Sequence, residues 1–131
     1  MSKTVTLNHI GLLNFDEKQA LKFYREILGF KEQYRFSLSA NEAEKIFAIR
    51  QNLQVIVFVK DGMKFEIFIP QKTIPFNPAV NHVCLNVAER SSIIARCKEN
   101  GLKVTEIRRP DRVTVFVNDF AGNVFELKEI D

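Results

Sequence analysis

The chain has 131 residues, of which 46% are hydrophobic and 27% are charged, a composition typical of a compact globular domain. The formal net charge is only +3 and the basic residues are scattered among acids, which argues against a nucleic-acid partner. The longest apolar run, residues 55–59, is far too short to cross a membrane. Two cysteines do not make a disulfide framework, and residues 1–4 resemble no leader, so we expect a cytoplasmic protein.

The first half of the chain predicts one helix followed by mostly extended segments. Residues 4–13 read as a strand with recurring apolar positions. A helix follows, with an N-cap at Asp16 and a stop at Gly29. The next predicted elements are a strand over 30–38, a short helix over 41–49, a strand over 53–59 and a strand over 63–70. The turn Asp61-Gly62 joins the last two strands.

After a linker at residues 71–79, the second half predicts the same order of elements. These are a strand over 81–87, a helix over 91–100, and strands over 102–107, 112–118 and 123–129. The order β-α-β-β-β therefore occurs twice. We predict an α+β fold in which residues 1–131 form a single domain of two tandem βαβββ modules, at about 4–70 and 80–130.

Short matching segments support a duplication. The matched pairs are residues 7–10 with 80–83, 29–31 with 101–103, 57–61 with 115–119, and 65–67 with 125–127. Four matches in the same order, with the same predicted elements between them, indicate a repeated unit rather than chance.

The two halves each place one histidine and one glutamate at matched positions. Strand alternation puts His9 and His82 opposite the apolar residues of their strands, and Glu66 and Glu126 opposite the flanking Phe and Leu or Ile residues. The apolar faces should pack on the helices, so all four side chains are expected on the other face. Imidazole and carboxylate donors suit Zn, Ni, Fe or Mn. The alternative is two ordinary histidines and two solvated glutamates, but this leaves the match between the halves unexplained.

Three segments resemble the vicinal oxygen chelate superfamily, which comprises glyoxalases, bleomycin-resistance proteins and extradiol dioxygenases. They are Asn-His-Ile-Gly-Leu at 8–12, Ala-Leu-Lys-Phe-Tyr-Arg-Glu-Ile-Leu-Gly-Phe at 20–30, and Asp-Phe-Ala-Gly-Asn-Val-Phe-Glu-Leu at 119–127. The resemblance covers essentially the whole chain. It implies that the modules form a curved mixed sheet that cups one divalent metal, with ligands on the first and last strand of each module.

Carried over to this sequence, the resemblance makes His9, Glu66, His82 and Glu126 the metal ligands. A set of this kind is similar to that of glyoxalase I, a lyase acting on glutathione hemithioacetals, in which a ligand glutamate moves protons. The resemblance therefore implies a lyase or isomerase with Glu126 and Glu66 as catalytic residues. It implies Zn or Ni as the metal, with Fe or Mn as alternatives.

Competing functions within the same superfamily are an acyl-CoA epimerase-like enzyme, an Fe(II) extradiol-type dioxygenase and a non-catalytic drug-binding resistance protein. In each case the partner is a small molecule. Phe58 and Phe116 are candidates for binding its apolar part, with core packing as the alternative. By analogy with the family we expect a homodimer. Two arrangements remain compatible with the repeat, because the modules around one metal can belong to one chain or to two swapped chains.

Overall fold

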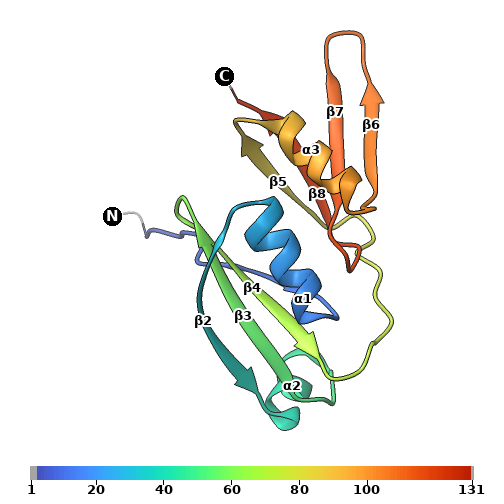
Figure 1. Cartoon of the computed structure of the whole chain (residues 1–131). Coiled ribbons are helices and arrows are strands. Elements are labelled where there is room, and N and C mark those ends of the chain that lie inside the picture. Colours follow the sequence, from blue (N-terminus) through green and yellow to red (C-terminus); the bar gives the residue numbers. More distant parts are fainter. Residues whose placement is uncertain (1–2, 131) are drawn as a thin grey trace.

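The computed structural model describes residues 3–130 and consists of two tandem modules, one above the other in Figure 1. The first contains β1 (Ile10–Leu13), α1 (Glu17–Ala20), η1 (Leu21–Ile27), β2 (Lys31–Leu38), α2 (Ala40–Phe47), β3 (Leu53–Lys60) and β4 (Met63–Pro70). The second contains β5 (His82–Val87), α3 (Arg90–Glu99), β6 (Val104–Arg108), β7 (Val113–Asn118) and β8 (Val124–Glu129). Each module has a four-stranded mixed sheet, ordered β1-β4-β3-β2 or β5-β8-β7-β6. The predicted architecture of two tandem βαβββ modules is confirmed.

The helix-packed faces of both sheets contribute to one shared core. Burial of apolar surface drives this arrangement, and α3 packs against η1 across the two modules. The core residues from the sheets alternate along their strands, as the sequence pattern predicts. They include Ile56, Phe58, Phe65 and Ile67 of the first sheet and Leu85, Val115, Val117, Phe125 and Leu127 of the second.

The opposite face of the first sheet is partly covered by α2. Ser39 caps this helix, and a capping box with Glu42 satisfies the first free backbone N–H groups. The ring of Phe47 at the end of α2 lies 5.2 Å from the ring of Phe68 on β4, edge to face. Both rings therefore form an apolar wall over one end of this face.

Two predicted elements differ from the structure. The first strand begins only at Ile10 rather than at residue 4, because in the described chain no neighbouring strand pairs with residues 3–9. The first helix changes after Ala20 into a seven-residue π-helix. Its wider turns place the consecutive residues Phe23 and Tyr24 both in the core.

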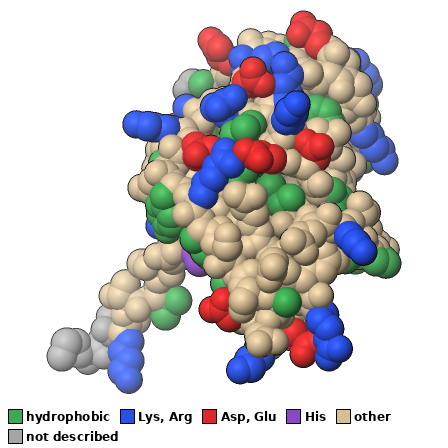
Figure 2. Space-filling model, turned by 60° about the horizontal axis from the view of Figure 1, so that its bottom comes forward, with side chains coloured by type: hydrophobic (Ala, Val, Ile, Leu, Met, Phe, Trp, Pro, Cys, Tyr) green, Lys and Arg blue, Asp and Glu red, His purple; other side chains and the backbone are tan. Residues whose placement is uncertain are grey.

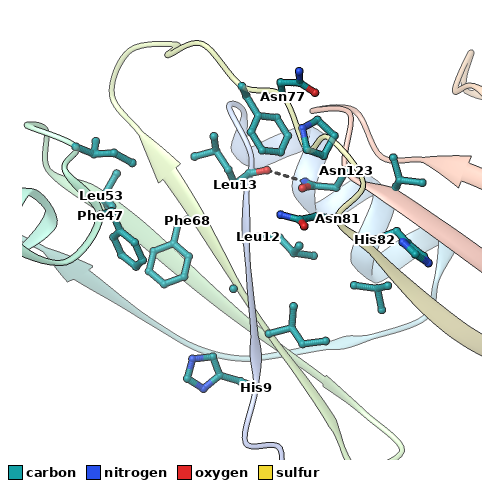
Figure 3. Close-up of a pocket in the computed structure, with 17 residues that line it drawn as sticks. His9, Leu12, Leu13, Phe47, Leu53, Phe68, Asn77, Asn81, His82 and Asn123 are labelled. Carbon is teal, nitrogen blue, oxygen red and sulfur yellow. Dashed lines mark hydrogen bonds between the residues drawn. The ribbon is translucent and has the colours of Figure 1, made fainter.

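A buried polar network ties the second module to the first. The carboxylate of Asp119 is only 3% exposed, and Oδ2 accepts hydrogen bonds from Tyr24 Oη at 2.7 Å, Asn123 Nδ2 at 2.8 Å and Asn14 Nδ2 at 3.1 Å. Oδ1 accepts two backbone N–H groups of its own turn. Asn123 Nδ2 also donates to the carbonyl of Leu13 at 2.7 Å, the dashed line in Figure 3. The buried charge is thus stabilised by five donors.

The surface carries no large patch of one charge on the side shown in Figure 2, where cations and acids are interspersed. None of the helices within residues 3–130 is long and apolar enough to cross a membrane.

Candidate metal centre

The first module places His9 and Glu66 side by side. Glu66 lies on β4 and its cross-strand partner on β1 is Gly11, two residues after His9. Because side chains alternate along a strand, His9, Gly11 and Glu66 share the face opposite the core. His9 Nε2 is 3.2 Å from Glu66 Oε1. The glutamate side chain is only 13% exposed, so it is partly desolvated beside the imidazole.

The second module repeats this arrangement in the same register. Glu126 on β8 is paired with Cys84 on β5, and Cys84 again follows a histidine, His82, by two residues. His82 Nε2 is 3.9 Å from Glu126 Oε1, and the glutamate side chain is 19% exposed. The predicted face is therefore correct for all four side chains, and within each module the histidine and glutamate lie together.

Local hydrogen bonds orient both imidazoles in the same way. His82 Nδ1 is 2.9 Å from the carbonyl oxygen of Val80, which can only accept, so Nδ1 carries the proton. His9 Nδ1 is 2.8 Å from Asn8 Oδ1, which assigns the same tautomer. In both modules the ring nitrogen that faces the carboxylate oxygen is Nε2. Imidazole nitrogens and carboxylate oxygens are both common metal ligands, so each pair fits a divalent metal.

One chain does not bring the two pairs together. Across residues 3–130 no three His, Cys, Asp or Glu side chains lie close enough to hold a metal ion. Instead His9 and His82 lie apart along the walls of a hollow of about 620 Å³ between β1 and β5 (Figure 3). Convergence of all four side chains on one metal therefore stays a prediction.

The two phenylalanines predicted as substrate contacts take different faces. Phe58 is fully buried in the core and stacks on Tyr24 with ring centroids 5.6 Å apart, so core packing applies and the substrate role is wrong for this residue. Phe116 is paired with Glu126 across the sheet, and its ring lies 6.3 Å from that of His82. Phe116 therefore remains a candidate substrate contact on the ligand face.

The sequence comparison aligns residues 57–59 with residues 115–117, both Val-Phe-Val. This alignment differs by one residue from the correspondence that the two sheets show. Glu66 is paired with Val57, whereas Glu126 is paired with Phe116. The reason is the length of the turn between the paired strands, two residues after Lys60 but five residues after Asn118. Local similarity therefore aligned residues that the sheets place on opposite faces.

Cys84 is a further residue close to the His82–Glu126 pair. Its thiol lies on the ligand face beside Glu126. Desolvation and the negative charge of Glu126 raise the pKa of Cys84 above its usual value. Gly11 occupies the equivalent place in the first module, where an added Cβ would meet the ring of Phe68 at 3.0 Å.

Comparison with known proteins assigns the family. The chain belongs to the Glyoxalase/Bleomycin resistance protein/Dioxygenase superfamily, whose family model matches residues 6–127. A search of curated proteins by sequence found no match.

Several solved structures share the fold. The fosfomycin resistance protein FosX from Listeria monocytogenes has a TM-score of 0.71 and 21% identity, over 98% of this chain and 96% of that chain. A glyoxalase family protein from Enterococcus faecalis has a TM-score of 0.70 and 23% identity, over 95% and 97%. A mutant of the Listeria FosX was solved with Mn(II) and 1S,2S-dihydroxypropylphosphonic acid, with a TM-score of 0.71 and 22% identity over 98% and 95%. At these identities the similarity establishes the fold.

Proposed function

We propose that this protein is a divalent-metal-dependent lyase or isomerase of the glyoxalase I-like type, which transfers a proton on a small substrate bearing neighbouring oxygen atoms. The observation that carries the proposal is the repeated His–Glu pair, His9 with Glu66 and His82 with Glu126, in the same register on the same face of each sheet. Chance placement does not account for two partly desolvated glutamates, each beside an oriented imidazole.

The complete site is assembled from two copies of the chain in this proposal. Each chain offers two half-sites. The histidine of each half-site lies just before or at the start of an edge strand, β1 or β5. Large apolar side chains next to these edges are exposed, with Val5 at 93%, Leu7 at 79% and Val80 at 86%. In Figure 2 residues 3–9 project from the body of the molecule. A second copy would cover these edges and bring its second module against the first module of its partner.

His9 and Glu66 of one copy and the partner's His82 and Glu126 would hold the metal. Two imidazoles and two carboxylates suit Zn or Ni, with Fe or Mn as alternatives. When bound, the metal supplies a Lewis acid that stabilises negative charge developing on a substrate oxygen.

The residues of the chain supply the remaining chemistry. Glu126 takes a proton from one carbon of the substrate and returns it to the adjacent carbon, and Glu66 is its counterpart from the other module. Their partial burial excludes much of the water that would compete for that proton. Phe116 flanks His82 and offers an apolar surface to the rest of the substrate.

The test combines metal content with turnover of hemithioacetals and 2-substituted acyl-CoA esters. Wild-type protein purified without chelator should contain one metal per proposed site and turn over one of these substrate classes. Glu126→Gln should retain part of the metal but lose turnover by about 10²–10⁴-fold, the usual worth of a general base. His82→Ala should lose metal and turnover together. Glu106→Gln, an exposed change on β6, is the matched control and should behave like wild type.

Each alternative has its own outcome. A metal-loaded protein inert toward both substrate classes would reject the proposed reaction. Ring cleavage of a catechol with Fe(II) would assign the dioxygenase alternative, and drug binding without turnover would assign the resistance-protein alternative. Full activity of Glu126→Gln would reject the role of this residue even if the reaction holds.

A further inference from the structure

A second hollow lies at one end of the second sheet and is lined by residues from both of its faces. Its volume is about 410 Å³, and it is formed where β7 begins, where β8 ends and where α3 begins. Figure 1 shows the end of β8 beside the beginning of α3. Glu126, Lys128 and Thr114 line the hollow from the sheet, and Arg90 lines it from α3. The hollow therefore adjoins the proposed metal centre through Glu126.

The carboxylates around this hollow are already engaged. Glu129 Oε2 accepts the backbone N–H of Arg90 at 2.8 Å, where α3 begins. Asp111 is paired with Arg112, with Oδ1 3.1 Å from Nη1. Glu126 faces His82 on the other side. Glu126 and Glu129 thus keep their negative charge beside the hollow, but neither lies within 4.0 Å of a charged side-chain nitrogen of Arg90 or Lys128.

The cations, in contrast, keep unused donors. Arg90 is half-buried, and its Nη1 donates to the carbonyls of Leu127 at 3.2 Å and Val113 at 3.4 Å. Arg109 Nε donates to Thr114 Oγ1 at 3.3 Å. Within residues 3–130, no carboxylate lies within 4.0 Å of the charged nitrogens of Arg90, Arg109 or Lys128. A half-buried guanidinium with only neutral partners is stabilised by an added anion.

We propose that this hollow binds an anionic group of the substrate, a carboxylate or a phosphate-type group, through the two lining cations that have no carboxylate partner, Arg90 and Lys128. Lys128 follows Glu126 by two residues on the same face of β8, which separates them by about 7 Å. A substrate whose oxygen atoms lie at the metal centre would therefore carry its negative charge a few bonds away. That this anion belongs to a substrate rests on the proposed function, whereas anion binding in the hollow does not.

The first experiment measures anion binding without turnover. The Zn-loaded full-length protein is titrated with inorganic phosphate, methylphosphonate or acetate, and backbone amide shifts are followed by NMR. The largest shifts are expected at Thr114 and Lys128. Lys128→Gln should weaken phosphate binding at least about fivefold, since a hydrogen bond to a charged group is worth roughly 1.5–3 kcal/mol. Lys98→Gln, the same change at an exposed site on the outer side of α3, should leave it unchanged.

The outcomes separate this proposal from the proposed function. Repeating the titration on His82→Ala tests whether phosphate binds without the metal centre, and shifts retained at Thr114 and Lys128 would support the hollow. Equal weakening by Lys98→Gln, shifts confined to residues around His82, or no binding at millimolar phosphate would overturn it. Tighter binding of the two phosphorus anions than of acetate would assign a phosphate-type group, and the reverse a carboxylate. Anion binding in an enzyme inactive on both substrate classes would reject the reaction but retain this site.

Discussion

Removing the hydroxyl of Tyr24 tests the network that holds the two modules together. Tyr24 is fully buried, and its hydroxyl donates to Asp119 Oδ2 at 2.7 Å. Tyr24→Phe deletes this donor without a change in ring size, so packing should be retained. A hydrogen bond to a charged group contributes roughly 1.5–3 kcal/mol. Because four other donors still reach the carboxylate, we expect a loss near the lower end, about 1.5–2 kcal/mol.

The same variant has a distinctive pH dependence. Burial, and then the charge of Asp119 and the hydrogen bond to it, raise the pKa of Tyr24 well above its ordinary value of 10.0. Above about pH 10 the unfolded chain loses this proton while the folded chain keeps it, so the folded state binds more protons. The free energy of unfolding then falls with rising pH, by up to about 1.4 kcal/mol per unit. Phenylalanine cannot titrate, so the difference between wild type and variant should narrow at alkaline pH.

The assay is urea-induced unfolding of both proteins at pH 7 and above pH 10, at equal chain concentration because association also contributes to stability. Tyr34→Phe is the control, since this ring is 46% exposed and should change stability by less than about 0.5 kcal/mol. A Tyr24→Phe variant as stable as the control at pH 7 would refute the network's contribution. A difference that stays constant between the two pH values would refute the argument from the pKa of Tyr24.

Two further predictions concern the helices. Asp16 is the N-cap of α1, and its Oδ1 accepts the backbone N–H of Gln19 at 3.0 Å. Asp16→Ala should therefore lower the free energy of unfolding in urea by about 1 kcal/mol. Lys18→Ala, at an exposed site, is the control and should lower it by less than half of that. Burial raises the pKa of the Cys97 thiol on α3 to about 11. In the native protein at pH 8, Cys97 should therefore resist a thiol reagent that labels the exposed Cys84. Rapid labelling of both thiols would contradict this prediction.

The sequence was informative wherever an element is defined by its own periodicity. Alternation along residues 82–87 and 124–127 correctly assigns the core face and the ligand face of β5 and β8, and with them the positions of His82 and Glu126. The order of elements is set by local turn and capping residues, and it is confirmed in both modules.

Other features depend on contacts between distant residues, and local patterns do not contain them. The π-helical turns of η1, which carry the buried residues Phe23 and Tyr24, have no local signal in the sequence. The Asp119 network joins residues 95 and 105 positions apart in the chain. Its only signal in the sequence is the Asp-x-x-Gly-Asn turn, which the family resemblance includes. The face of Phe58 was unpredictable for a related reason, since a longer turn in the other module shifts the register.

The separation of the two His–Glu pairs predicts that metal affinity depends on protein concentration. Within the described chain each module offers one pair, and no third His, Cys, Asp or Glu lies near enough to either pair to hold a metal. Two donors bind a divalent ion much more weakly than four, because each further ligand adds to the binding free energy. If the site is completed by a second copy, metal affinity must rise with protein concentration, since association and metal binding are linked.

The experiment is equilibrium dialysis against a fixed free Zn concentration. It compares chain concentrations above and below the midpoint of dimer dissociation, which sedimentation measures. The metal content should fall as the dimer content falls. Removing metal with a chelator should in turn shift the sedimentation equilibrium toward monomer. Metal content that stays constant while dimers dissociate would refute a site shared between copies, and would require the two modules of one chain to close upon the ion instead.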